Sequence, residues 1–224
     1  VGQGEDAWPQ VLERRLGESG RKVQVINCGF AAGSYSPAGY DTWMVSDGLL
    51  LEPDLVIVGF CLNDMGNGND IPMLSYQTVS TAGYALALID HFVTAYLNRE
   101  AKSRVPDFAK IVKAHPETWN ATQVGLRNLQ RILDEKEIPL VIAVIPMVSQ
   151  LDLDPYPYEV LHVMIGDYCR RNSLPCVDLK SAFVGQNEVD LWVPPTDQHP
   201  NHVGQGYLGD GIYEFLREQN LLPR

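Results

Sequence analysis

The feature that most constrains the fold of this chain is a regular alternation between helical patterns and short apolar runs. The apolar runs lie at 22–27, 54–61, 139–145 and 175–179. The run at 54–61 (DLVIVGFC) is almost continuously apolar, which is typical of a strand that is covered on both faces. Strands that alternate with helices form βαβ units. The sequence therefore predicts an α/β fold with a mostly parallel sheet.

Between these runs, apolar residues recur at helical spacing, and we expect helices over 8–16, 118–136, 156–171 and 202–218. The inward positions of the third helix are expected to be Val160, Leu161, Met164 and Tyr168. The 224 residues suit a single domain. The segment 65–116 is irregular apart from an expected helix at 82–97. We interpret it as an insertion that forms a wall or lid.

The composition limits the classes of partner. The net charge is −11 and the isoelectric point is about 4.8, so the surface repels phosphate backbones and anionic lipids. Nucleic acid is therefore a poor candidate. No run approaches the roughly 18 apolar residues of a membrane-spanning helix. The four cysteines show no zinc-site spacing; Cys169 and Cys176 could pair across a turn, but spacing alone does not decide this. Oligomeric state and compartment stay open.

A carboxylate and a histidine lie close together near the carboxyl end of the chain, in the stretch 194–202 (PPTDQHPNH). Asp197 precedes His199 by two residues, and such a carboxylate can set the tautomer of an imidazole and stabilise its charged form. One alternative is a surface histidine before a helix that Asn201 caps. Another is a metal site, because Asp197, His199 and His202 are all ligand types.

Two further loops follow predicted strands, where ligands bind in parallel sheets. After the strand at 22–27, small residues around Gly33 would let the backbone approach a ligand and point N–H groups at it. After the strand at 54–61, Asn63 could aim its amide N–H at a developing oxyanion. The plain alternatives are a tight turn around Gly33 and an Asx turn at Asn63.

These three segments, in this order, resemble blocks two, three and five of the SGNH (GDSL-like) hydrolases. The resemblance implies a flavodoxin-like three-layer α/β/α sandwich and an ester hydrolase that needs no metal or organic cofactor. It also implies that Gly33, or Gly29 as the alternative, and the Asn63 side chain help form the oxyanion hole. Asp197 and His199 would complete a triad with a serine.

The chain departs from the family pattern in three places. Cys61 stands where the family has a glycine, and Asp197 lies two rather than three residues before His199. The third departure is the absence of a GDS block. The opening segment 1–9 resembles the stretch that follows that block. We therefore expect the chain to be incomplete at its amino-terminal end, with the first, central strand and its serine upstream of Val1.

Ser34 and Ser36 lie near the proposed oxyanion loop, and we interpret both as turn residues. The predicted function is serine-dependent hydrolysis of carboxylic esters through an acyl-enzyme, of the esterase, lipase or carbohydrate deacetylase type. The substrate would be a small-molecule or carbohydrate ester. A binding domain that keeps the fold without the chemistry, and an O-acyltransferase acting on sugars, are the alternatives. A sugar could stack on aromatic residues near the site, which are Tyr35, Tyr40, Trp43 and Trp192.

Overall fold

The structure is a computed structural model, and it describes residues 7–29, 39–65, 110, 112–113, 116–151, 153–193 and 199–223. Within these ranges the helices (α, and η for short 3-10 helices) and strands are, in chain order, α1 (Trp8–Glu18), α2 (Tyr40–Ser46), η3 (Gly48–Leu51), β1 (Val56–Cys61), η4 (Leu62–Met65), α5 (Pro116–Asp134), β2 (Leu140–Ile145), α6 (Glu159–Arg171), β3 (Cys176–Asp178), η6 (Leu179–Phe183), η7 (Glu188–Leu191) and α7 (His202–Glu218).

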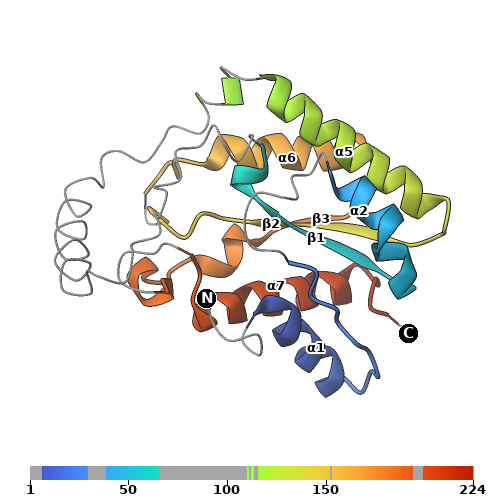
Figure 1. Cartoon of the computed structure of the whole chain (residues 1–224). Coiled ribbons are helices and arrows are strands. Elements are labelled where there is room, and N and C mark those ends of the chain that lie inside the picture. Colours follow the sequence, from blue (N-terminus) through green and yellow to red (C-terminus); the bar gives the residue numbers. More distant parts are fainter. Residues whose placement is uncertain are drawn as a thin grey trace, which may run out of the picture.

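The sheet contains three described strands in the order β1-β2-β3, and both pairings are parallel. Helices α2, α5 and α6 cover one face, and α1 and α7 cover the other (Figure 1). This arrangement confirms the predicted α/β fold with a parallel sheet, and it is the layering of a three-layer α/β/α sandwich.

The position of β2 in the middle of the three described strands explains why its sequence is continuously apolar. Leu140, Ile142 and Val144 pack in the core on the side of α5 and α6. The alternate side chains of Val141 and Ala143 pack in the core on the side of α1 and α7. Because successive side chains of a strand point to opposite faces, a strand with helices on both faces needs apolar residues at every position.

Helices α1 and α7 approach each other closely at Gly209. A Cβ atom added to Gly209 would lie 2.6 Å from Cβ of Val11. Polar contacts flank this approach: the Trp8 backbone N–H donates to Oε1 of Gln205 over 3.0 Å, and Nε of Arg15 lies 2.9 Å from Oδ1 of Asp210. Glycine therefore lets α7 pack against α1 at van der Waals distance, which fixes the helix that follows His199.

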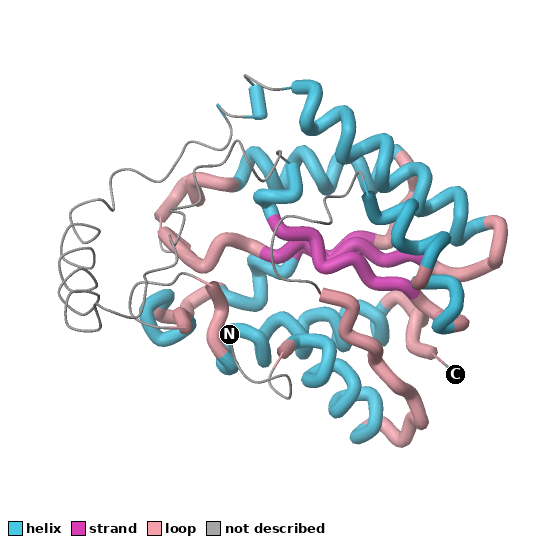
Figure 2. The backbone as a smooth tube through the Cα atoms, in the orientation of Figure 1, coloured by secondary structure: helices cyan, strands magenta, loops and turns pink. Residues whose placement is uncertain are grey.

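The predicted strand over 22–27 forms no ladder in the described structure, so this prediction is wrong (Figure 2). Its exposure still alternates: Val23 and Val25 are half-buried against the core of α1 and α7, while Lys22 is exposed. The Val25 N–H donates to Oε2 of Glu13 over 2.5 Å. Among the described strands β1 pairs only with β2, so the segment has the period of a strand but no neighbour with which to share a ladder.

The predicted face of α6 is displaced by one position. Leu161 and Tyr168 are buried as expected, whereas Val160 and Met164 are only partly buried. Further buried positions of this helix are His162, Ile165 and Cys169. The helix thus turns a histidine toward the sheet, a placement that needs a polar partner.

Several predictions concern residues that the structure does not describe. Most of the proposed insertion at 65–116, including the helix expected at 82–97, lies outside the described residues.

All four cysteines are free thiols. Cys169 and Cys176 therefore do not pair as a disulfide. Among the described helices, none combines the length and apolar character needed to cross a bilayer.

Candidate functional site

The carboxyl ends of the parallel strands meet at one edge of the sheet, and this edge holds the candidate site. β1 runs directly into the short helix η4, which contains Asn63. β2 is followed by the loop that leads to α6, and β3 is followed by η6. Loops beyond the carboxyl ends of parallel strands are the usual ligand-binding positions of such folds.

The turn that carries Asn63 is anchored on both sides. Leu62 and Met65, which flank it within η4, are fully buried. Oδ2 of Asp64 accepts a hydrogen bond from the Cys61 backbone N–H over 3.0 Å and another from the Tyr40 hydroxyl over 3.3 Å. The backbone of Asn63 is therefore fixed at the end of β1, while its side chain lies outside the described structure.

Helix α5 holds the same turn from a third direction. The hydroxyl of Thr122 donates to the Asp64 carbonyl over 2.9 Å, and the hydroxyl of Thr118 donates to the Met65 carbonyl over 3.1 Å. Both threonines are buried. Two hydroxyls thus satisfy carbonyl groups that a single turn of 3-10 helix leaves without a partner.

The carboxyl group of Asp64 has a pKa above its ordinary value. Burial raises its pKa to about 6, and the hydrogen bonds from Cys61 and Tyr40 offset only part of that rise. Burial also raises the pKa of the Cys61 thiol to about 12, with a further contribution from the Asp64 charge. Burial, with the same charge, raises the pKa of Tyr40 as well. The hydroxyl of Tyr40 therefore stays protonated and serves as a donor.

His199 lies three residues before the start of helix α7, and backbone hydrogen bonds hold the chain around it. The Val193 N–H donates to the His199 carbonyl over 3.1 Å, and the Asn201 N–H donates to the Leu191 carbonyl over 2.7 Å. An antiparallel bridge joins Trp192 to Pro200. The His199 side chain itself is exposed, as a base that meets a substrate must be.

The side chain of Asn201 closes this arrangement. Its Oδ1 accepts from the N–H groups of Val203 and Gly204 at 2.9 and 3.2 Å, which caps α7 as predicted. Its Nδ2 donates to the carbonyls of Asp190 and Trp192 at 2.8 and 3.0 Å. The helix cap and the two ends of the His199 loop are thus joined through one side chain, a second role that the sequence did not indicate.

A tryptophan ties this loop to the sheet edge. Nε1 of Trp192 donates to the carbonyl of Val148, which lies in the loop after β2. The N–H of Leu151, in the same loop, donates to Oε2 of Glu188 over 3.3 Å. Because β1 and β2 are parallel neighbours, these contacts place the His199 loop at the edge where the Asn63 turn also lies.

The remaining predicted site residues divide into two groups. Gly33 and Asp197 lie outside the described residues, as do Ser34 and Ser36. Gly29 is described, and its N–H donates to Oδ1 of Asn27 over 2.9 Å. This contact occupies the N–H group of Gly29, so Gly33 is the donor that we carry forward.

The aromatic residues considered for sugar stacking have packing partners. Tyr40 bonds to Asp64 and Trp192 bonds to Val148. Trp43 packs, partly buried, against the core beneath α5. In each case the ring contributes to the wall or the core, and Tyr35 lies outside the described ranges.

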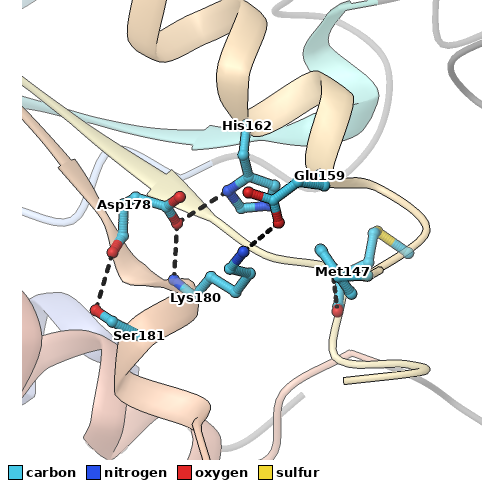
Figure 3. Close-up of polar contacts among 7 residues, drawn as sticks. Met147, Glu159, His162, Asp178, Lys180 and Ser181 are labelled. Atoms are coloured by element: carbon cyan, nitrogen blue, oxygen red, sulfur yellow. Dashed lines mark hydrogen bonds and ion pairs between the residues drawn. The ribbon is translucent and has the colours of Figure 1, made fainter. Parts of the chain in front are cut away.

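A second histidine–carboxylate pair, which the sequence did not predict, lies between α6 and β3 (Figure 3). Nδ1 of the buried His162 is 2.9 Å from Oδ1 of Asp178. The same oxygen accepts from the Lys180 N–H over 2.9 Å, and the Lys180 ammonium pairs with Glu159. Burial by itself would raise the pKa of Asp178, but the bonds to His162 and Lys180 outweigh it and lower that pKa.

The geometry of this pair indicates packing rather than catalysis. Nε2 of His162 is buried and has no hydrogen-bond partner in the described structure. The His162 side chain is 1% exposed, and its contact with Asp178 joins α6 to the end of β3. Within the described residues, no group of three His, Cys, Asp or Glu side chains is placed to hold a metal ion.

Comparison with known proteins agrees with this architecture. Neither the curated proteins nor the solved structures gave a match to the chain. A protein family does match, over residues 1–207, and its description is "GDSL-like Lipase/Acylhydrolase family". That span covers most of the 224 residues and includes the Asn63 turn and the His199 loop. A match of this extent confirms the resemblance and indicates an acylhydrolase type of function: the chain belongs to the GDSL-like lipase/acylhydrolase family.

Proposed function

We propose that this protein hydrolyses carboxylic esters through a serine-linked acyl-enzyme. In this proposal His199 is the general base, and Asp197 orients its imidazole. The Asn63 side chain and the Gly33 N–H donate to the oxyanion, and each such donor contributes about 3 kcal/mol of transition-state stabilisation. A small-molecule or carbohydrate ester is the proposed substrate.

The observation that carries the proposal is the anchoring of two loops at one sheet edge. The Asn63 turn is held by Asp64 and two threonines of α5. The His199 loop is held by Asn201 and by the contact of Trp192 with the loop after β2. Preorganised donors and a held base are what acyl transfer requires, since fixed dipoles need no reorganisation in the transition state.

The chemistry follows from these roles. The serine oxygen attacks the ester carbonyl carbon while His199 takes the hydroxyl proton, and the carbonyl oxygen becomes the oxyanion. The tetrahedral intermediate then expels the alkoxide, which receives that proton from His199 and leaves as the alcohol. Water attacks the acyl-enzyme with His199 again as the base. The carboxylic acid is released and the serine is regenerated.

The source of the serine is part of the proposal. β1 has an open edge among the described strands, and the segment 21–26 keeps the alternating exposure of a strand without a partner. An unpaired strand edge is a liability that folded proteins cover. We propose that a further parallel strand covers this edge and carries the nucleophilic serine at its carboxyl end.

The test is covalent labelling together with turnover. The full-length protein is incubated with a short p-nitrophenyl ester and, separately, with a fluorophosphonate probe, and the labelled peptide is identified by mass spectrometry. We expect turnover and a single labelled serine; a label on Ser34 or Ser36 would overturn our interpretation of those residues. His199→Ala should abolish turnover with little change in folding.

His202→Ala is the matched control, because His202 is an exposed neighbour of His199 on the same loop and helix start. It should retain turnover, whereas equal loss in both variants would favour the metal-site alternative. A folded full-length protein that neither turns over the ester nor takes the label would overturn the hydrolase proposal. That result would favour a binding domain.

A further inference from the structure

Asp64 is the one side chain that links η4 to helix α2 by a hydrogen bond in the described structure. Its Oδ2 accepts from the Cys61 N–H at the end of β1 and from the Tyr40 hydroxyl at the start of α2. One oxygen atom therefore joins two elements that are far apart in the sequence. Cys61 lies two residues before Asn63 in the sequence.

The positions of these two elements in the sequence relate the Asp64 hydrogen bonds to the proposed oxyanion donors. Asn63 is adjacent to Asp64 in η4. Helix α2 begins at Tyr40, seven residues after Gly33. A second contact holds the amino-terminal turn of α2: Nδ2 of Asn128 in α5 donates to Oδ2 of Asp41 over 2.8 Å. Helix α5 thus forms hydrogen bonds with both α2 and η4, and Asp64 joins η4 to α2.

We propose that Asp64 is a positioning residue that holds the Asn63 turn against helix α2 and so sets the position of Asn63, the proposed oxyanion donor of this turn. This inference rests on the proposed function. Asp64 does not touch the reacting atoms in this proposal; it acts through Asn63. A displacement of about 1 Å at a catalytic group can lower the rate roughly 100-fold, so a link of this kind matters for turnover more than for substrate binding.

The surroundings of Asp64 determine the pH at which its carboxyl group ionises. The titratable groups that face it are the Tyr40 hydroxyl from α2 and the Cys61 thiol from β1. From α5, neutral hydroxyls reach the backbone of the same turn: Thr122 donates to the Asp64 carbonyl and Thr118 to the Met65 carbonyl. Among the described residues, no cation offsets the rise of this pKa to about 6. The carboxylate that forms above that pH is stabilised mainly by its two hydrogen-bond donors.

The kinetic test separates the acceptor oxygen from the charge. Asp64→Ala removes the acceptor, and we expect kcat to fall roughly 10- to 100-fold with KM changed less than about twofold. Asp64→Asn keeps an oxygen that can accept both hydrogen bonds, so it should restore most of kcat. Tyr40→Phe deletes one donor oxygen, and kcat should fall by an intermediate factor even if Asp64→Ala folds poorly. Asp54→Asn, at an exposed position before β1, should behave as wild type.

A second readout does not depend on catalysis. The side-chain amide resonance of Asn63, followed by NMR as pH is varied, should shift with a midpoint near pH 6. Asp64→Asn should abolish this step, and His199→Ala should leave it in place, because the step reports the ionisation of Asp64 rather than of the base.

The outcomes are distinct. Wild-type turnover that both Asp64→Ala and Tyr40→Phe retain in full would overturn the positioning role and leave the proposed function intact. An Asn63 resonance that does not follow Asp64 would overturn the positioning role too. A protein without turnover refutes the proposed hydrolase function, and the NMR titration then decides alone whether Asp64 controls the turn.

Discussion

Replacing Asp178 with alanine should destabilise the fold by about 2–3 kcal/mol. The change removes the acceptor of two hydrogen bonds, from His162 Nδ1 and from the Lys180 N–H, both at 2.9 Å. A hydrogen bond to a charged group is worth about 1.5–3 kcal/mol, and a helix cap about 1 kcal/mol. We take the lower end for the first, because 46% of the Asp178 side chain is exposed and solvent screens its charge.

The cost falls mainly on the buried histidine. In Asp178→Ala, both ring nitrogens of His162 would lack a protein partner, since Nε2 has none among the described residues. Asp178→Asn keeps an acceptor oxygen and loses only the charge, so it should cost about 1 kcal/mol. Asp167→Ala is the control, on the helix α6 that carries His162. It removes a pair with Arg170, whose side chain is 77% exposed, and should cost less than about 0.5 kcal/mol.

Urea unfolding followed by circular dichroism measures these differences. The pKa of Asp178 is lower in the folded state than in the unfolded chain. Its contribution is therefore present above the unfolded pKa of about 3.9 and is lost as pH falls through the folded value. The gap between wild type and Asp178→Asn should narrow below about pH 4. Equal free energies of unfolding for Asp178→Ala and Asp167→Ala would refute this account of the pair.

Two further predictions concern the helix that follows His199. Gly209→Ala would place a Cβ atom 2.6 Å from Cβ of Val11, and it should lower the free energy of unfolding by about 1–3 kcal/mol. The control is Gly206→Ala, because the space around an added Cβ there is open. Thermal unfolding of both variants should show Gly206→Ala to be neutral or stabilising. Asn201→Ala should cost about 1 kcal/mol through the lost cap and lower kcat. Asn201→Asp keeps the cap but not the Nδ2 donor, so the variant should be stable and have a lowered kcat. Full ester turnover in Asn201→Asp would contradict the idea that the Asn201 side chain holds the His199 loop in place.

The parts of the fold that the sequence predicted are those with a local cause. β2 was recognisable because burial on both faces requires apolar residues at every position. The start of α7 was recognisable because an asparagine cap binds N–H groups only two and three residues ahead. Such signals lie within a few residues of the feature that they specify.

The features that the sequence did not predict depend on distant partners. His162 faces the sheet because Asp178, sixteen residues further on, supplies an acceptor at the end of β3. The segment 22–27 has the composition of a strand, but a ladder also requires a neighbour at the right edge. The hydrogen bond between Tyr40 and Asp64 spans 24 residues. None of these pairings leaves a pattern in the local sequence.

The same distinction explains how the candidate site is built. His199 is held by contacts within a short stretch, 190–204, in which one asparagine serves as helix cap and loop clamp. The Asn63 turn is held by long-range contacts from α2 and α5. The family motifs therefore point to the residues that we propose as base and oxyanion donor. The residues that fix their relative positions, Asp64 above all, emerge only when the strands are brought together.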